Sequence, residues 1–265
     1  AQSRYKCVSS TFCSTCHTSF CFTCAGTPHE PAKCNHVLDW NKTISSTASW
    51  IVLNTKPCPL CNVKIEKNDG CNHMRCAHCH AHFCWICLGV FDTREVYTHA
   101  CNVPSDAPKN NEKRKKFYLE RYHAHAQSEA YAKSLLSKTL NTITEMDLWH
   151  ILSESDKGVI FSSRQIVFES RRFIKNSFIF AYYMNNDRDD KRHTMFESHQ
   201  VALEQFIEHL SKITEHNDRE QWSTMGEDLF RKYIKSTALH TLAVKNYIAR
   251  MSNFIQINNM EDEDL

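Results

Sequence analysis

The second half of this chain lacks the residues that most often interrupt or cross-link a fold. All 14 cysteines lie within the first 101 of its 265 residues, no proline follows Pro108, and only Gly158 and Gly226 follow residue 109. Proline and glycine disfavour the interior of a helix more than any other residue. Their scarcity predicts long helices in the second half, and the absence of cysteine confines thiolate chemistry to the first.

The sequence also contains no apolar run long enough to span a membrane. Its most apolar stretch, Ile160 to Tyr183, is interrupted by Arg171, Arg172 and Lys175, whereas a membrane-spanning helix needs about 20 consecutive, predominantly apolar residues. We therefore expect this stretch to be a buried helix of a bundle, and we expect no association with a membrane.

The rest of the second half has helical spacing as well. Phe117, Tyr118, Tyr122, Tyr131 and Leu135 recur near the period of a helix. Four or more long helices favour a bundle. After a charged loop from Asn185 to Arg192, the further expected helices are Phe196–Ile213 and Asp218–Ile257.

A strong excess of positive charge is absent too, because the formal net charge is only +2. The basic run from Lys109 to Lys116 has no aromatic residues between its charges, and no segment has the two-Cys, two-His pattern of a DNA-binding finger. We expect a solvated helix face there and no binding to nucleic acid.

The first 101 residues contain five pairs of cysteines with the spacing C-x2-C. The pairs begin at Cys13, Cys21, Cys58, Cys76 and Cys84. This spacing lets two thiolates turn back onto one zinc ion. Disulfides are the alternative, but the beginning of the sequence has no signal-peptide character, and the nearby histidines favour metal.

The spacing groups these pairs into three complete zinc sites and part of a fourth. The complete sets are Cys21, Cys24, His29 and Cys34; Cys58, Cys61, Cys76 and Cys79; and Cys84, Cys87, His99 and Cys101. Cys13 and Cys16 need two more ligands. Cys7 and His17 offer them at poor spacing, so we favour ligands upstream of residue 1, with Cys7 as the interior thiol of a strand.

Metal replaces a hydrophobic core in this part of the chain. Apolar runs such as Phe20–Phe22 and Phe83–Ile86 are too short to stabilise a fold, so zinc binding contributes folding free energy directly. Three further histidines, His78, His80 and His82, are expected to face solvent. The predicted fold is therefore small zinc-stabilised modules followed by an all-α helical bundle.

Cys71 lies outside every ligand set, in the run Gly70-Cys71-Asn72-His73-Met74. Together with Cys58-Pro59-Leu60-Cys61 and Phe83-Cys84-Trp85-Ile86-Cys87, this run resembles the catalytic second RING-like domain of RING-between-RING ubiquitin ligases. The stretch from Cys21 to Cys34 resembles the C-terminal half of their in-between-RING domain. The helical tail resembles that of the Ariadne branch. The sequence has no counterpart of the family's first RING domain, which recruits the ubiquitin-conjugating enzyme.

The resemblance implies four segments. Residues 1–36 are the C-terminal part of the in-between-RING domain, 37–56 a linker helix, 57–103 the catalytic module, and 104–265 the Ariadne-type helical domain. Within the linker we expect a helix from Thr43 to Leu53, begun by Thr43 or Ser45. Trp40 and Trp50 are expected to pack on the flanking modules.

It also implies that Cys71 accepts ubiquitin from a conjugating enzyme as a thioester, which a substrate lysine then attacks. Cysteine suits this role because its thiolate is strongly nucleophilic and leaves well. His73 matches the family's general base, which deprotonates the lysine. Many members carry a glutamate that orients this histidine where His82 stands here, so the partner of His73 is left open. Gly70 predicts an open turn with access to Cys71.

In the Ariadne branch the helical domain covers the catalytic cysteine until a cullin-RING ligase modified with a ubiquitin-like protein releases it. The counterparts of the covering residues here are Tyr131 and Glu208, although Ala132 replaces the usual acid beside Tyr131. A helical scaffold without a regulatory role is the alternative.

Two classes of function follow. The first is an E3 ubiquitin ligase acting through Cys71, with zinc as cofactor and ubiquitin, a conjugating enzyme and protein substrates as partners. We expect it in the cytoplasm, with the nucleus as a second location. The second is a non-catalytic, zinc-dependent scaffold that binds ubiquitin or the conjugating enzyme. The two classes differ in whether Cys71 becomes charged with ubiquitin.

Overall fold

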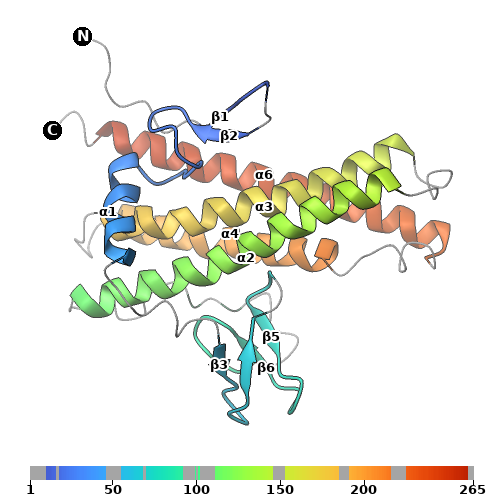
Figure 1. Ribbon diagram of the computed structural model, residues 1–265, viewed down its shortest axis with the longest axis horizontal. Helices are drawn as coiled ribbons and strands as arrows, with labels where there is room; N and C mark the ends of the chain where they lie inside the picture. The colour runs from blue at the N-terminus through green and yellow to red at the C-terminus, as the bar shows by residue number, and fades with distance from the viewer. Residues whose placement is uncertain are drawn as a thin grey trace.

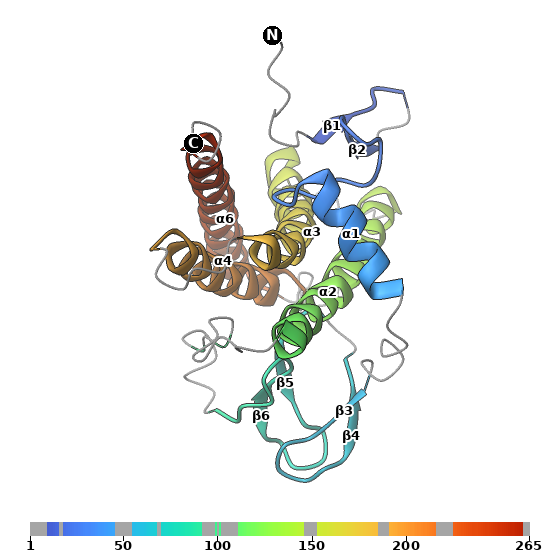
Figure 2. The same cartoon turned by 90° about the vertical axis from the view of Figure 1, so that its left-hand side faces the viewer.

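The computed structural model describes residues 10–15, 18–45, 55–67, 70–91, 99, 101, 111–145, 153–184, 191–215 and 225–261. Within these residues, two small modules rich in cysteine lie on opposite sides of a bundle of four long helices (Figures 1 and 2). The predicted fold class, zinc-stabilised modules followed by a helical bundle, is confirmed.

Both modules are built from short antiparallel hairpins. The first pairs β1 (Ser10–Phe12) with β2 (Ser19–Cys21), and the second contains β3 (Thr55–Pro57) with β4 (Lys64–Glu66) and β5 (His73–Arg75) with β6 (His82–Cys84). Isolated two-stranded hairpins are marginally stable in water at best. The turns that carry the cysteines must therefore stabilise them.

Four of the cysteine pairs form the same tight turn. In each, the N–H of the first cysteine donates to the carbonyl oxygen five residues later. The residue after the second cysteine has a positive φ in all four turns; these residues are Ala25, Asn62, His80 and Leu88. Cys13 begins the fifth pair in the same way, because its N–H donates to Thr18 O at 3.0 Å.

The bundle consists of α2 (Asn111–Glu145), α3 (Glu154–Tyr183), α4 (Lys191–Glu215) and α6 (Glu227–Glu261). Helix α3 packs against the other three. The long helices follow the scarcity of proline and glycine, as predicted. Two boundaries differ, because Lys191 and Arg192 belong to α4 and not to a loop, and α6 begins at Glu227, just after Gly226, and not at Asp218. Residues 218–224 lie outside the described part of the chain.

The core of the bundle lies along α3. Ile174, Phe178 and Ile179 are almost completely buried, together with Leu203 and Leu210 of α4. The apolar stretch from Ile160 to Tyr183 is thus the buried helix that the sequence predicts. Among the described helices, none combines the length and the apolar character needed to cross a membrane.

A helix lies in the linker region, at an earlier position than the one predicted there. Helix α1 spans Cys34–Ser45, so Thr43 and Ser45 lie at its end. Residues 46–53, which hold most of the predicted helix, lie outside the described residues. The apolar residues Val37, Trp40 and Ile44 of α1 follow helical spacing and pack against the bundle core. Trp40 is fully buried, with edge-on contacts to Tyr122 of α2 and Tyr182 of α3. Trp50 lies outside the described residues.

The basic run at the beginning of α2 is only partly a solvated face. Lys113 and Lys116 are exposed. Arg114 instead donates to Tyr182 O at 2.6 Å, and its guanidinium lies over the Tyr182 ring. The run therefore helps to attach the beginning of α2 to the end of α3.

Candidate active site and metal centres

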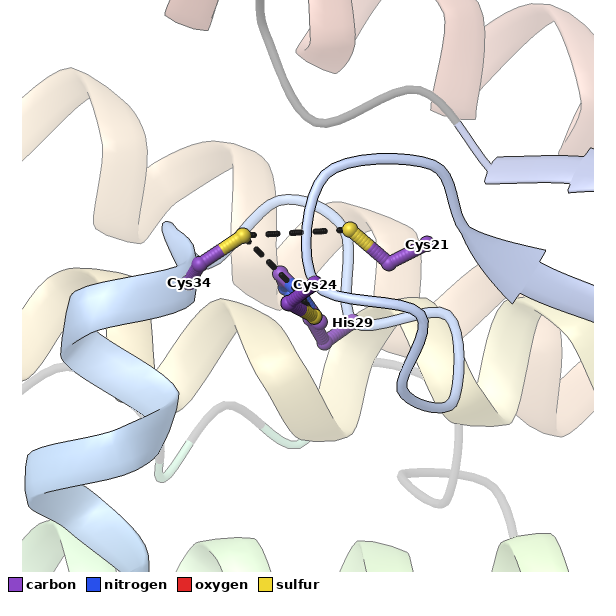
Figure 3. A group of neighbouring side chains, drawn as sticks. All are labelled: Cys21, Cys24, His29 and Cys34. Atoms are coloured by element: carbon purple, nitrogen blue, oxygen red, sulfur yellow. Dashed lines mark hydrogen bonds between the residues drawn. The ribbon is translucent and has the colours of Figure 1, made fainter.

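The first metal centre joins the hairpin of the first module to α1. Cys21 ends β2, Cys24 and His29 lie in the following loop, and Cys34 begins α1, with all four side chains pointing toward one point (Figure 3). Cys21 Sγ lies 3.8 Å from Cys34 Sγ, and His29 Nε2 lies 3.4 Å from Cys24 Sγ. The other ring nitrogen of His29 is 2.8 Å from Ala32 O. This contact fixes the tautomer that directs Nε2 toward a metal.

The second module contains two more centres. Cys58 and Cys61 meet Cys76 and Cys79, with sulfur–sulfur distances of 3.6 Å for Cys58–Cys79 and Cys61–Cys76. The remaining centre contains Cys84, Cys87, His99 and Cys101, with 3.7 Å between Cys84 Sγ and Cys101 Sγ.

These distances fit zinc and exclude disulfides. In a tetrahedral site with Zn–S bonds of about 2.3 Å, the sulfurs lie about 3.8 Å apart. A disulfide would bring them to about 2.05 Å. In each cluster all four ligand atoms lie within 4.8 Å of one another. The zinc prediction is confirmed. The twelve residues that the structure brings together are those of the three complete ligand sets predicted from the sequence spacing.

We expect at least three zinc ions per chain by elemental analysis. Cys58→Ser should lower the number by one, because a structural zinc site needs all four ligands. Substitution of the exposed Leu60 in the same turn is the matched control and should leave the metal content unchanged. A wild-type value clearly below three would contradict the ligand sets. Cys7, Cys16 and His17 lie outside the described residues, so the fourth site stays a prediction.

Cys71 lies immediately before β5, outside all three centres. Cys71 as a residue is partly exposed, and the N–H of His73 points at its Sγ from 3.4 Å. Gly70 is buried in this arrangement, and the open turn expected there stays a prediction. Helix α4 covers this loop, because both carboxylate oxygens of Glu208 lie 3.3 Å from the backbone N of Asn72.

Glu208 is held in place by a buried arginine of α3. Arg171 is fully buried, and its Nη1 lies 2.6 Å from Glu208 Oε1, while Nη2 donates to Ser211 at 3.1 Å. Burial acts to raise the pKa of Glu208, but the charge and hydrogen bond of Arg171, together with smaller contributions from Cys71 and Lys67, outweigh it and lower the pKa to about 2. Glu208 is therefore a carboxylate at neutral pH.

Burial and the Glu208 carboxylate both disfavour ionisation of the neighbouring thiol. Burial, followed by the charge of Glu208, raises the pKa of Cys71 well above its usual value. The thiol, and not the nucleophilic thiolate, is therefore the prevailing form of Cys71 at neutral pH in this arrangement.

His73 is paired with His82 across the β5–β6 hairpin. Their Nε2 and Nδ1 atoms lie 2.7 Å apart, and the rings are stacked at 4.9 Å. His82 is therefore half-buried, which corrects the expectation that it faces solvent, whereas His78 and His80 are exposed as expected. Burial, with His82 and Lys212 adding to it, lowers the pKa of His73 to about 4. His73 is thus neutral at neutral pH and able to accept a proton.

Asn72 is the point where both covering helices meet the loop. Its Oδ1 accepts from Lys67 at 2.8 Å, and Lys67 also donates to Ser128 Oγ of α2 at 2.6 Å. Its Nδ2 donates to Glu204 of α4 at 3.0 Å. Glu204 in turn lies 3.3 Å from the buried His125 of α2.

The two residues expected to cover the cysteine have different positions. Glu208 lies at the loop, whereas Tyr131 is half-buried further along α2, and Ala124 and Ser128 make the α2 contacts with Lys67. Ala132 packs within the bundle core, where an acidic side chain would be costly. The sequence predicted no role at this site for Lys67, Asn72, Glu204 and Arg171. Of these four residues, only Arg171 was recognisable from the sequence as unusual, because it is a charged residue within an apolar stretch.

The chain is similar in sequence to proteins of one family. A family model described as the IBR domain matches residues 53–102, which cover the second module. The chain is 33% identical over 214 residues to "E3 ubiquitin-protein ligase dbl4" of Schizosaccharomyces pombe, covering 76% of this chain and 42% of that protein. It is 35% identical over 237 residues to "E3 ubiquitin-protein ligase ari-1.1" of Caenorhabditis elegans, with coverages of 82% and 47%. The human "E3 ubiquitin-protein ligase ARIH1" is 32% identical over 216 residues, with coverages of 76% and 38%. The chain therefore spans less than half the length of these relatives.

Proposed function

Because the chain belongs to the Ariadne branch of the RING-between-RING family, we propose that it is the catalytic and regulatory part of an E3 ubiquitin ligase. Ubiquitin would be carried as a thioester on Cys71 and transferred to a lysine. The observation that carries this proposal is a thiol outside all three metal centres, with His73 beside it and the Glu208 carboxylate on its loop.

The proposed reaction has two acyl transfers. The Cys71 thiolate attacks the thioester carbonyl carbon of the charged conjugating enzyme, whose thiolate leaves. A lysine amine then attacks the carbonyl carbon of the Cys71 thioester, His73 takes the proton that the nitrogen loses, and the C–S bond breaks to release the Cys71 thiolate. Since Nε2 of His73 is engaged by His82, its Nδ1 is the atom available to accept that proton.

The metal centres support this chemistry without taking part in it. Zinc with four protein ligands has no open position for substrate, and it supplies folding free energy. The Cys58 centre holds the hairpin that precedes the loop, and the Cys84 centre holds β6, on which His82 lies. Both centres thereby fix Cys71 and His73 relative to each other.

The contacts of α2 and α4 support autoinhibition. Ser128, Glu204 and Glu208 hold the loop from the side of the helices. Glu208 both covers Cys71 and disfavours its thiolate. Release would require separation of the module from α4. The family resemblance suggests a cullin-RING ligase modified with a ubiquitin-like protein as the releasing partner, acting in the cytoplasm and also in the nucleus.

We expect Glu208→Ala to raise the rate at which a ubiquitin-based thiol probe labels Cys71 by roughly tenfold or more. Each unit by which the thiol pKa falls toward neutral raises the thiolate fraction about tenfold. The rate can be followed by intact mass and peptide mapping. Glu227→Ala, which removes an exposed carboxylate paired with Arg231 on α6, is the control and should change nothing.

Glu208→Ala alone breaks the buried ion pair with Arg171, and breaking such a pair costs about 3–5 kcal/mol. We therefore include the double variant Arg171→Met with Glu208→Ala, named the released chain below, which removes both charges of the pair. An equal gain in labelling is expected. If only the single variant gained reactivity, loosening of the bundle would be the cause, and autoinhibition by Glu208 would be rejected.

The proposal as a whole is tested by mixing the chain with a charged conjugating enzyme and the family's first RING domain. A ubiquitin adduct on Cys71 that reducing agent removes is the expected result on a non-reducing gel. Absence of the adduct in the released chain under the same conditions would favour a non-catalytic scaffold.

A further inference from the structure

The loop at Cys71 presents two successive backbone N–H groups beside the sulfur. The N–H of Asn72 points at the Glu208 carboxylate, with both oxygens at 3.3 Å, and the N–H of His73 points at Cys71 Sγ at 3.4 Å. Successive N–H groups that converge in this way form a concave site for an anion. In the closed chain the anion at Asn72 is a carboxylate.

The Asn72 N–H is held by contacts that belong to the catalytic module itself. Asn72 is only 5% exposed. Its carbonyl accepts from Trp85 N at 2.7 Å, and its side chain accepts from Lys67 at 2.8 Å. Only the contacts with Glu204 and Glu208 come from α4. When α4 departs, the N–H therefore keeps its position and loses its acceptor.

Acylation of Cys71 creates an anion near this position. Cys71 first gives its thiol proton to solvent. Its thiolate forms a bond to the thioester carbon, and the carbonyl π electrons become a negative charge on oxygen. This oxygen is bound to the carbon that Sγ has attacked, so it lies beside the backbone that follows Cys71. Collapse of the oxyanion expels the donor's thiolate, which takes a proton from solvent.

We propose that the backbone N–H of Asn72 is the oxyanion donor for acyl transfer at Cys71, and that the Glu208 carboxylate takes the place of this oxyanion in the closed chain. The inference rests on the proposed function and deepens it. On this inference the Glu208 carboxylate does more than block access to Cys71, because it also mimics the negative charge that develops on oxygen during acyl transfer. Lys67 then acts as a positioning residue that aims the N–H through the Asn72 side chain.

The test replaces the amide between Cys71 and Asn72 with an ester in the released chain. The ester can be introduced in a synthetic segment covering residues 71–100, which is joined to the rest of the chain by ligation at Cys71 and at Cys101. The acyl donor is ubiquitin carrying a C-terminal thioester of a small thiol, which requires no conjugating enzyme. We expect acylation of Cys71 to slow by about 10²- to 10³-fold, the usual loss for one oxyanion donor.

Alkylation separates this role from a structural one. Iodoacetamide reacts with the same thiolate without forming an oxyanion, so its rate at Cys71, read by peptide mapping, should be unchanged by the ester. The matched ester at His73 removes the N–H that points at sulfur and should change both rates by the same factor. Asn72→Ala keeps the N–H and should slow acylation less than the ester does.

Equal loss of acylation and alkylation in the Asn72 ester, or no loss of either, would overturn the inference. If the all-amide released chain is not acylated at all, the proposed function fails instead. If the ester chain holds fewer than three zinc ions, it is not correctly folded, and NMR of the all-amide chain then tests whether the Asn72 N–H binds the oxyanion. Addition of ubiquitin aldehyde, which forms a thiohemiacetal with Cys71, should then move the Asn72 amide proton downfield, and an unmoved signal would reject the role.

Discussion

A Cys71→Ser chain is expected to accumulate a ubiquitin adduct that survives reducing agent, is cleaved by base, and is not transferred to lysine. A hydroxyl in place of the thiol can be acylated, but an alkoxide leaves far less readily than a thiolate, so the reaction stops after its first step. Non-reducing and reducing gels, each with and without brief treatment with base, distinguish the two adducts. Transfer to lysine should fall to the background of the assay.

Cys7→Ser is the matched control, because Cys7, like Cys71, belongs neither to a C-x2-C pair nor to one of the three complete ligand sets. It should leave both charging and transfer unchanged. Full ligase activity of the Cys71→Ser chain, measured together with the family's first RING domain, would contradict a thioester at this position. The scaffold hypothesis would then replace the catalytic one.

A His73→Ala chain is expected to form the thioester on Cys71 and to discharge it onto lysine about 10²-fold more slowly, the usual scale for loss of a general base. Single-turnover discharge of a preformed adduct measures this step by itself. In the closed chain, burial, followed by His82 and Lys212, lowers the pKa of His73 to about 4. Departure of α4 removes Lys212 and part of the burial, so the pKa of His73 rises above that value in the open chain. Wild-type discharge through His73 should therefore fall as the pH drops through this raised pKa.

Two variants serve as controls for His73. His78→Ala removes an exposed imidazole from the same zinc module and should leave discharge unchanged. His82→Glu restores the residue type common in the family and should keep discharge close to the wild-type rate, because a carboxylate can also accept from His73 Nε2. If His73→Ala slowed the formation of the thioester as much as its discharge, His73 would not be a base specific to the second step.

Local spacing predicted the metal centres well because each pair of ligands is fixed by its own short turn. The third and fourth ligands are close in sequence too, as in His29 and Cys34. Long helices were predicted for a similar reason, since helical structure depends on neighbours three and four residues away. Helix α1 was not predicted, although Val37, Trp40 and Ile44 follow helical spacing, because the prediction rested on the apolar run Trp50-Ile51-Val52-Leu53, which lies outside the described residues.

The surroundings of Cys71 could not be predicted in the same way. Asn72 and Glu208 are 136 residues apart in sequence, and Lys67 and Ser128 are 61 apart. No local pattern relates such residues, and only the packing of the module against α2 and α4 brings them together. The pairing of His73 with His82 was also hidden, because it depends on the register of β5 and β6.

The contact between Asn72 and Glu208 joins two parts of one chain, so its strength is governed by effective concentration. A tethered partner acts as if it were present at about millimolar concentration. A contact that would be negligible between separate molecules can thus keep nearly every copy closed. To turn a population that is 99% closed into one that is 99% open, an activator must bind the open form about 10⁴-fold more tightly than the closed one. The proposed autoinhibition therefore predicts an activator that discriminates strongly between the open and closed forms.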